Sequence, residues 1–169
     1  VPCLPLLNCS AFGQVALPSR TLGDTVHSLS VAANAFWHGY DRILEGLGRY
    51  YHQGGTENIH YHLVGDILPE YENLVEKCDL SRHVTLHGRL FGEPLEELYR
   101  LCTIGIDILG GHRKDFPVSS TLKSQEYGAW GLPLVTSSPV DYMGTDSPWQ
   151  HLVPYDDSPV DIEAMLRWY

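Results

Sequence analysis

The chain has 169 residues, of which 43% are hydrophobic and 19% are charged, and its formal net charge is −10. This length and composition fit one globular domain and exclude a disordered or fibrous chain. A nucleic-acid-binding groove is excluded as well, because such grooves bind phosphates through clustered basic side chains and the chain has only 11 lysines and arginines.

The sequence contains no pattern typical of a membrane segment or a metal site. Its longest apolar runs are far shorter than the roughly 20 residues of a membrane-spanning helix, and residues 1–7 lack the basic start of a secretory signal. The four cysteines form no C-x-x-C pair, which favours free thiols in a reducing cytosol, and His60 and His62 alternate as residues of a strand do. We therefore expect no metal ion, no resident cofactor and a cytoplasmic location.

Strands and helices alternate along most of the chain. Residues 1–26 contain several prolines and little periodicity, so we expect an irregular lead-in to the same domain, which continues through residues 27–169. Hydrophobic periodicity predicts strands at 27–33, 59–64, 84–87, 104–109, 134–136 and 151–153, and helices at 40–51, 70–78, 94–102, 122–130 and 160–168. Because parallel strands need crossover connections, this order predicts an α/β fold, a Rossmann-like parallel sheet of about six strands with helices on both faces.

The loop before the fourth helix has the residues of an anion-binding site. Ligands of such sheets bind beyond the carboxyl ends of the strands, and the loop at 110–121 lies there. Three hydroxyl residues at 119–121 suit the start of a helix, and Lys123 and Glu126 follow within its first turns. A helix N-terminus beside a cation and a carboxylate can hold a phosphate and a ribose together.

Four phrases occur in an order and at a spacing that together are specific. They are HLVGD at 62–66, VTLHGR at 84–89 followed by EELY at 96–99, LKSQEYGAWGLPLV at 122–135, and WHGYDR at 37–42. The first three resemble the C-terminal, donor-binding domain of GT-B glycosyltransferases of the retaining, group 1 kind. The fourth resembles a polysaccharide-synthesis subgroup of that family. The resemblance therefore implies one half of a GT-B fold.

The resemblance also implies a nucleotide site. Glu126 stands where the second glutamate of the family's E-x7-E motif accepts hydrogen bonds from the donor ribose. Val118 stands where the first glutamate contacts the transferred sugar, so half of the motif is absent. The further positions that the resemblance implies are Ser120, Thr121, Leu122 and His38 for the diphosphate and Gly88 and Arg89 for the base. We also expect a binding role for Trp37, because a Trp, a His, a Gly and a Tyr clustered on the first βα loop exceed what a tight turn needs.

The family's pair of phosphate-binding cations has no direct counterpart here. His38 falls near the position of its lysine, and the arginine position holds Ala33 or Asn34. Two replacements stay open. Lys123, Arg113 and Lys114 could form a compensating cluster, or His38 could be protonated beside the diphosphate, because an adjacent anion raises the pKa of an imidazole.

The implied function is that of half an enzyme. We expect this chain to bind a nucleotide-diphosphate sugar and to complete a hexosyltransferase of polysaccharide or glycoconjugate synthesis together with an N-terminal Rossmann-like domain that precedes Val1. The catalytic residues, unidentified here, are then expected largely in that domain, and the isolated chain is expected to be inactive. The full-length enzyme is expected in the cytoplasm, with the inner face of the membrane as a further option. Two alternatives remain, half of a GT-B sugar-nucleotide epimerase and a non-catalytic flavodoxin-like binding module.

Overall fold

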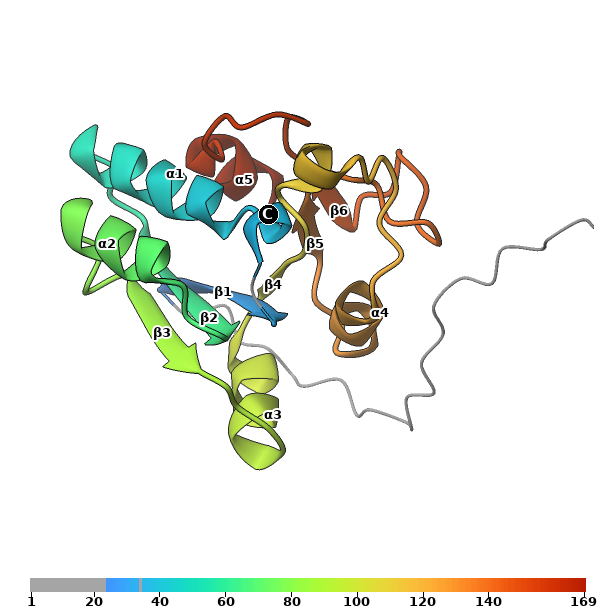
Figure 1. Ribbon diagram of the computed structural model, residues 1–169, viewed down its shortest axis with the longest axis horizontal. Helices are drawn as coiled ribbons and strands as arrows, with labels where there is room; N and C mark the ends of the chain where they lie inside the picture. The colour runs from blue at the N-terminus through green and yellow to red at the C-terminus, as the bar shows by residue number, and fades with distance from the viewer. Residues whose placement is uncertain (1–23, 34) are drawn as a thin grey trace, which may run out of the picture.

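Six parallel strands form one sheet, in the order β3-β2-β1-β4-β5-β6 (Figure 1). The computed structural model describes residues 24–33 and 35–169, so residues 1–23 of the expected lead-in lie outside the described part. The strands are β1 (Thr25–Ala32), β2 (Asn58–Gly65), β3 (Val84–Gly88), β4 (Ile104–Ile106), β5 (Leu134–Thr136) and β6 (Gln150–Leu152). The helices are α1 (Tyr40–His52), α2 (Pro69–Lys77), α3 (Glu93–Leu101), α4 (Leu122–Ala129) and α5 (Ile162–Trp168), with 3-10 turns η1 (Phe36–His38) and η2 (Gly111–Lys114). The predicted fold class is confirmed.

The first and fourth strands differ from their predicted bounds. β1 begins two residues earlier than expected, because Thr25 continues the parallel pairing with Asn58 of β2. β4 ends at Ile106 instead of residue 109. Beyond Ile106 the backbone still bonds to β5 and the residue after it, through Asp107 N–H to the carbonyl of Val135 at 2.9 Å and Ser137 N–H to the carbonyl of Ile108 at 2.7 Å. Leu109 then donates its N–H to the carbonyl of His38, 2.8 Å away, in the loop after β1. The shortened strand thus joins two loops at the carboxyl edge of the sheet.

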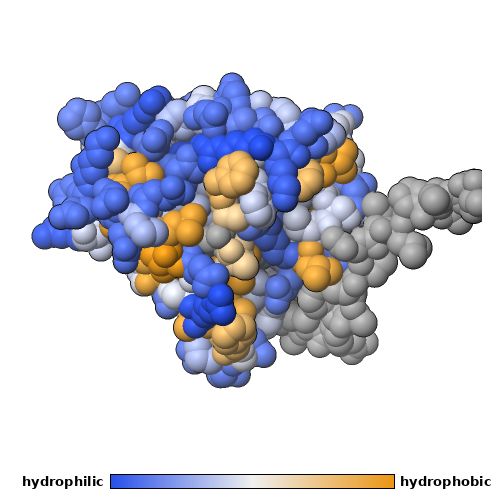
Figure 2. All heavy atoms as spheres, in the orientation of Figure 1, coloured by the Kyte–Doolittle hydropathy of each residue, from blue (hydrophilic) through white to orange (hydrophobic). Residues whose placement is uncertain are grey.

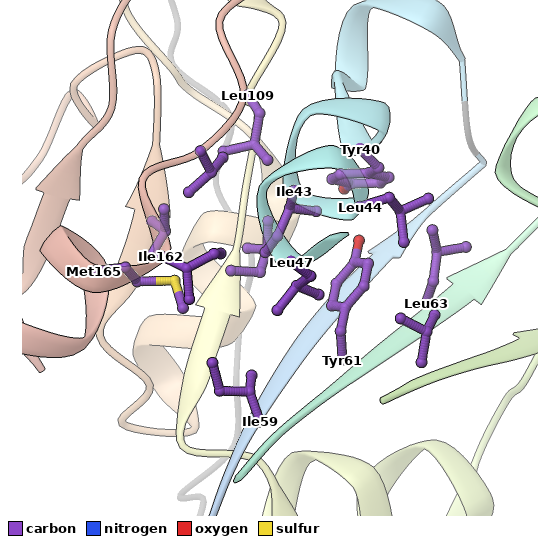
Figure 3. Close-up of a cluster of buried hydrophobic side chains, with 14 of the residues drawn as sticks. Tyr40, Ile43, Leu44, Leu47, Ile59, Tyr61, Leu63, Leu109, Ile162 and Met165 are labelled. Atoms are coloured by element: carbon purple, nitrogen blue, oxygen red, sulfur yellow. The ribbon is translucent and has the colours of Figure 1, made fainter. Parts of the chain in front are cut away.

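Helices cover both faces of the sheet, with α1, α2 and α5 packed on one side and α3 and α4 on the other (Figure 1). On α1, Ile43, Leu44 and Leu47 follow helical spacing and are fully buried. They face Tyr61 of β2 and Met165 of α5 in the larger core cluster (Figure 3). Burial of one such side chain contributes about 1.5–3 kcal/mol, which fixes α1 on the sheet.

A buried arginine joins α1 to two distant segments. Arg42 has no exposed surface, and its guanidinium donates to the carbonyls of Leu109, Ser158 (2.6 Å) and Pro154 (2.9 Å). The nearest carboxylate is the largely exposed Asp156, 4.0 Å away. Burial therefore lowers the pKa of Arg42, and the carbonyls supply most of its compensation. One side chain thus ties α1 to the end of β4 and to the segment before α5.

Replacing Arg42 by methionine should destabilise the protein strongly. The variant Arg42→Met leaves three carbonyls without their donor, one from a buried hydrogen bond and two from part-buried ones, and a buried unsatisfied group costs about 1–3 kcal/mol. We expect a loss of about 3–5 kcal/mol in the free energy of unfolding, measured in urea. Arg49→Met, at an exposed position of the same helix, is the control and should change it by less than about 1 kcal/mol. Equal effects of the two variants would contradict the joining role.

Four histidines meet on one face of the sheet. The Nδ1 atom of His27 on β1 lies 3.0 Å from Nε2 of His62 on β2, and Nδ1 of His62 lies 2.9 Å from Nε2 of His87 on β3. His60 lies beside them and bonds to Thr85 through Nε2. Burial and the neighbouring histidines lower the pKa of His62 to about 3. This row of four histidines, His27, His60, His62 and His87, is therefore neutral at physiological pH, with one proton in each nitrogen–nitrogen hydrogen bond.

The row should make folding sensitive to acid. A histidine of the unfolded chain titrates near pH 6.5, whereas folded His62 stays neutral until about pH 3, so the unfolded chain binds more protons between these values. Stability contributed by the neutral form is complete above pH 6.5 and declines as the pH falls toward 3. For His62 the decline from pH 7.5 to 5 is about 2 kcal/mol.

Unfolding in urea at pH 7.5 and 5 measures this decline. His62→Leu should reduce the loss of stability between the two pH values by about 2 kcal/mol relative to the unmodified chain. Val64→Ala, which removes a buried neutral side chain from the same strand, should lower stability at both pH values and keep the full decline. An unchanged decline in His62→Leu would show that His62 is charged in the folded state.

Candidate functional site

The strand order reverses between β1 and β4, and the loops that follow these two strands leave the sheet in different directions. Open α/β sheets bind ligands at this reversal, beyond the carboxyl ends of the strands. The two loops touch here. Gly39, with φ +69°, lies so close to Gly110 that a Cβ atom would overlap the backbone of the second loop. A glycine is therefore required at residue 39, both for its conformation and for the close approach.

A buried carboxylate organises the loop that follows β4. Asp107 is fully buried, and it accepts hydrogen bonds from Ser119 Oγ at 2.6 Å and Thr121 Oγ1 at 2.9 Å. Thr121 also caps α4, because its side chain accepts the N–H of Ser124 at 3.1 Å. Asp107 is not among the site residues predicted from the sequence. The available signal was an aspartate within an apolar strand at the edge where ligands bind.

Lys123 is the cation of this group. Its side chain is 10% exposed, and Nζ lies 3.5 Å from Asp107 Oδ1 and 3.2 Å from the hydroxyl of Tyr40. Burial lowers the pKa of Lys123, while the Asp107 carboxylate acts in the opposite direction. Tyr40 is fully buried at the start of α1, and its ring centre lies 5.5 Å from Nζ. The structure thus places a lysine at the first turn of α4, as the sequence predicts, but largely beneath the surface.

His38 lies beside this lysine in a neutral form. Its ring stacks on Tyr40, with centroids 5.5 Å apart and planes 16° apart, and Nδ1 accepts the N–H of Ala35 at 2.9 Å. Burial and the charge of Lys123 lower the pKa of His38 to about 3. Because a backbone N–H can only donate, Nδ1 carries no proton and Nε2 does. The expected protonation of His38 beside a diphosphate stays a prediction, because an adjacent anion would act against both causes of this low pKa.

Each cation of the expected cluster of Lys123, Arg113 and Lys114 has partners of its own in the structure. Arg113 binds both oxygens of Asp41, at 2.8 and 2.6 Å, and one oxygen of Asp157 at 2.7 Å. It also donates to a carbonyl of η1. Lys114 places Nζ 4.0 Å above the indole of η1. Arg113 therefore links η1, α1 and the segment before α5, and its guanidinium is already occupied by carboxylates.

Two further candidates lie at the ends of β2 and β3. Arg89 makes a two-pronged bond to Asp66, with Nε at 2.5 Å and Nη2 at 2.9 Å, and its side chain is 67% exposed. Gly88 has φ +69° and open space where a Cβ atom would lie. These features form an exposed turn that a flat ring could approach. Trp37, in contrast, packs edge-on against its neighbour Phe36, with ring centroids 5.1 Å apart.

The helix α4 carries the remaining candidates. Glu126 lies beside Tyr99 of α3, where burial and the Glu126 carboxylate raise the pKa of that tyrosine. Ser120 is half-buried just before the helix, and Leu122, its first residue, is 55% exposed. Val118, at the position of the missing first glutamate, is 53% exposed. The start of α4 thus presents backbone N–H groups between apolar side chains.

The described residues offer no arrangement for a metal ion or a membrane span. Within residues 24–33 and 35–169, no three histidine, cysteine or carboxylate side chains are placed to hold a metal. Nor does that part of the chain contain a helix long and apolar enough to cross a membrane.

Neither a family model nor a curated protein sequence matches the chain, but solved structures do. The match with sucrose-phosphate synthase from Thermosynechococcus elongatus covers 84% of this chain and 35% of the synthase, at 19% identity and a TM-score of 0.64. WaaG, a glycosyltransferase involved in lipopolysaccharide biosynthesis, matches 70% with 30% of its length, at 20% identity and a TM-score of 0.54. HepE from Anabaena, solved with UDP and glucose, matches 83% with 37% of its length, at 16% identity and a TM-score of 0.56.

These likenesses confirm the predicted resemblance at the level of fold. The chain has the Rossmann-like fold of a domain of GT-B glycosyltransferases. It spans about a third of the length of the solved structures named above.

The state of His38 can be read directly by nuclear magnetic resonance. With selective ¹⁵N labelling, we expect Nδ1 to give the signal of an unprotonated ring nitrogen and Nε2 that of a protonated one, unchanged from pH 8 to pH 5. Lys123→Met should move the midpoint of the titration upward, because the charge of Lys123 disfavours a second cation. A midpoint above pH 5 in the unmodified chain would contradict the neutral assignment.

Proposed function

We propose that this chain is the donor-binding half of a glycosyltransferase that transfers a hexose from a nucleotide-diphosphate sugar in polysaccharide or glycoconjugate synthesis. The observation that carries the proposal is the buried Lys123 at the first turn of α4, at the point where the strand order reverses. A lysine beside the first N–H groups of a helix at this point suits a phosphate. The fold supports the same function, since the matched structures named above include a synthase and a glycosyltransferase.

Each part of a nucleotide has a counterpart on this edge. The diphosphate would lie against the N–H groups of residues 120–122 and Lys123, with His38 donating from Nε2. The ribose hydroxyls would donate to Glu126. The base would lie at the turn of Gly88 and Arg89, where open space surrounds the glycine. A structure with UDP among the matched proteins is consistent with this class of ligand.

A second domain would complete the site. Exposed apolar side chains flank the loops of this edge, and they are Phe36, Phe116, Val118 and Leu122. On the face that Figure 2 shows, apolar residues form separate patches among hydrophilic ones. Exposed apolar residues beside a polar site are typical of a surface that another domain covers. The chain spans about a third of the matched structures, and we propose that the missing part holds an N-terminal Rossmann-like domain with most catalytic residues.

The proposed separation of donor binding and catalytic residues into two domains has a direct consequence for activity. The isolated chain would bind the donor without transferring its sugar, and the complete enzyme would work in the cytoplasm or at the inner face of the membrane. Measurable sugar transfer by the isolated chain would contradict the proposal that catalytic groups lie elsewhere. The epimerase and the flavodoxin-like module receive no comparable support from the matched structures named above.

Nucleotide binding can be tested by thermal shift. A ligand that binds only the folded state raises the melting temperature. Because the proposed site holds a nucleoside diphosphate, UDP or GDP should raise the melting temperature more than CMP or NAD at equal concentration. Lys123→Met should weaken binding by about 10- to 100-fold, because a hydrogen bond to a charged group is worth about 1.5–3 kcal/mol. Glu126→Gln should weaken it by about 10-fold through the ribose.

Two exposed positions provide matched controls. Lys77→Met on α2 and Glu97→Gln on α3 make the same chemical changes away from the start of α4, and both should bind as the unmodified chain does. The proposal fails if none of the nucleotides shifts the melting temperature. It also fails if each variant and its control lose the same affinity.

A further inference from the structure

The pair formed by Asp107 and Lys123 is unusual because both members are buried. Asp107 has no exposed surface and Lys123 only 10%, and their charged atoms lie 3.5 Å apart. Two charges removed from water are stable only when further hydrogen bonds satisfy them. Ser119 and Thr121 supply such bonds to the carboxylate, and the Tyr40 hydroxyl supplies one to the ammonium.

The contacts of Lys123 use only part of the hydrogen-bonding capacity of its ammonium group. A lysine ammonium has three N–H donors, and among the described residues Asp107 and Tyr40 are its two polar partners. The third donor has no partner among the described residues. A flexible side chain of four methylene groups is thus held at two points, so the direction of its remaining donor is restricted. The same carboxylate fixes Thr121, the residue that caps α4.

Asp107 also favours the charged form of Lys123. Burial alone lowers the pKa of Lys123, and the carboxylate counteracts this. The other groups around the lysine give no such help. Tyr40 is neutral because burial holds its pKa well above the usual range, and His38 is neutral beside it. Lys114, the next cation along the chain, lies over the indole of Trp37.

We propose that Asp107 is the positioning residue of the anion site, which holds Lys123 charged and aimed at a ligand phosphate and holds the first turn of α4 in register through Ser119 and Thr121. Asp107 is enclosed and does not itself touch the ligand. The inference rests on the proposed function, because it assigns a role within the same nucleotide site.

The competing interpretation is purely structural. In that case Asp107 only anchors the loop between β4 and α4, and Lys123 would keep its charge and affinity for any folded variant. The two interpretations differ in pH dependence. Without Asp107 the pKa of Lys123 should fall, so phosphate binding should become sensitive to pH only if Asp107 maintains the charge.

The test is calorimetric titration of UDP into the intact chain at pH 6 and pH 8. All affinities are taken as ratios to the unmodified chain at the same pH, so that protonation of UDP cancels. Asp107→Asn keeps the shape and one acceptor, and it should lose at least 10-fold in affinity at pH 8 and recover part of the loss at pH 6. Lys123→Met should lose the same factor at both pH values. The double variant should lose less affinity than the product of the two single losses, because the part of the Asp107 effect that acts through Lys123 is already absent in Lys123→Met.

Several outcomes would overturn the inference. A ratio for Asp107→Asn that is equal at both pH values indicates a structural role, and so does a double variant whose loss is the product of the two single losses. If Asp107→Asn fails to fold, Ser119→Ala removes one bond to the carboxylate and keeps both charges. It should lose more UDP affinity than the exposed control Ser81→Ala, and equality of the two overturns the inference.

The proposed function can fail separately. If the unmodified chain binds no nucleotide, the nucleotide site itself is refuted, and the role of Asp107 within it falls too. If the unmodified chain binds UDP and the Asp107 variants behave as the structural interpretation requires, only the inference about Asp107 is refuted.

Discussion

The buried guanidinium of Arg42 is the contact on which the carboxyl edge of the sheet depends. It donates to carbonyls just after β4 and at two points before α5, so three segments far apart in the sequence converge on one cation. If one of these carbonyls moved away, a buried N–H donor of the Arg42 guanidinium would lose its acceptor. Asp107 lies two residues before Leu109, and the carbonyl of Leu109 accepts a hydrogen bond from Arg42. The anion site is therefore built on a loop whose starting point is fixed.

Cations at this edge are matched by carboxylates. Lys123 pairs with Asp107, and Arg113 pairs with Asp41 and Asp157. In a chain with a net charge of −10, such pairing leaves no broad positive field. An anion would be held instead by directed donors, namely backbone N–H groups, one ammonium and a neutral imidazole. A site of this kind selects a ligand by the positions of its oxygens, whereas an extended polyanion would be repelled by the remaining surface.

The sequence predicts local structure well because it depends on periodicity. The helix expected at 40–51 is observed at Tyr40–His52, and its buried face follows the apolar spacing. The roles of charged residues could not be predicted in the same way. Arginine is mostly exposed in proteins, so nothing local indicated that Arg42 is buried. Arg113 resembled a free phosphate ligand because its partner Asp41 lies 72 residues away in the sequence.

The same limit applies to the protonation state of His38 and explains the omission of Asp107. The pKa of His38 is set by burial and by Lys123 of α4, which lies far along the chain. Asp107 stands in the apolar run that predicts β4, and its role becomes visible only when Ser119 and Thr121 fold back onto it. Spacing along the chain indicates which edge of the sheet a residue reaches. It does not indicate which opposite charge meets it there.

The nucleotide half of the proposed site is better defined than the sugar half, and the difference is physical. The start of α4 offers N–H groups, Lys123 and Glu126, all suited to phosphates and ribose hydroxyls. Val118, where the resemblance places a sugar-contacting carboxylate, is apolar and exposed, and Leu122 beside it is exposed too. These side chains offer sugar hydroxyls no hydrogen bond. Under the proposed function, polar groups that select the sugar must therefore come from other loops or from the second domain. That domain would also bury the apolar rim, so that covering the rim and completing the sugar pocket would occur together.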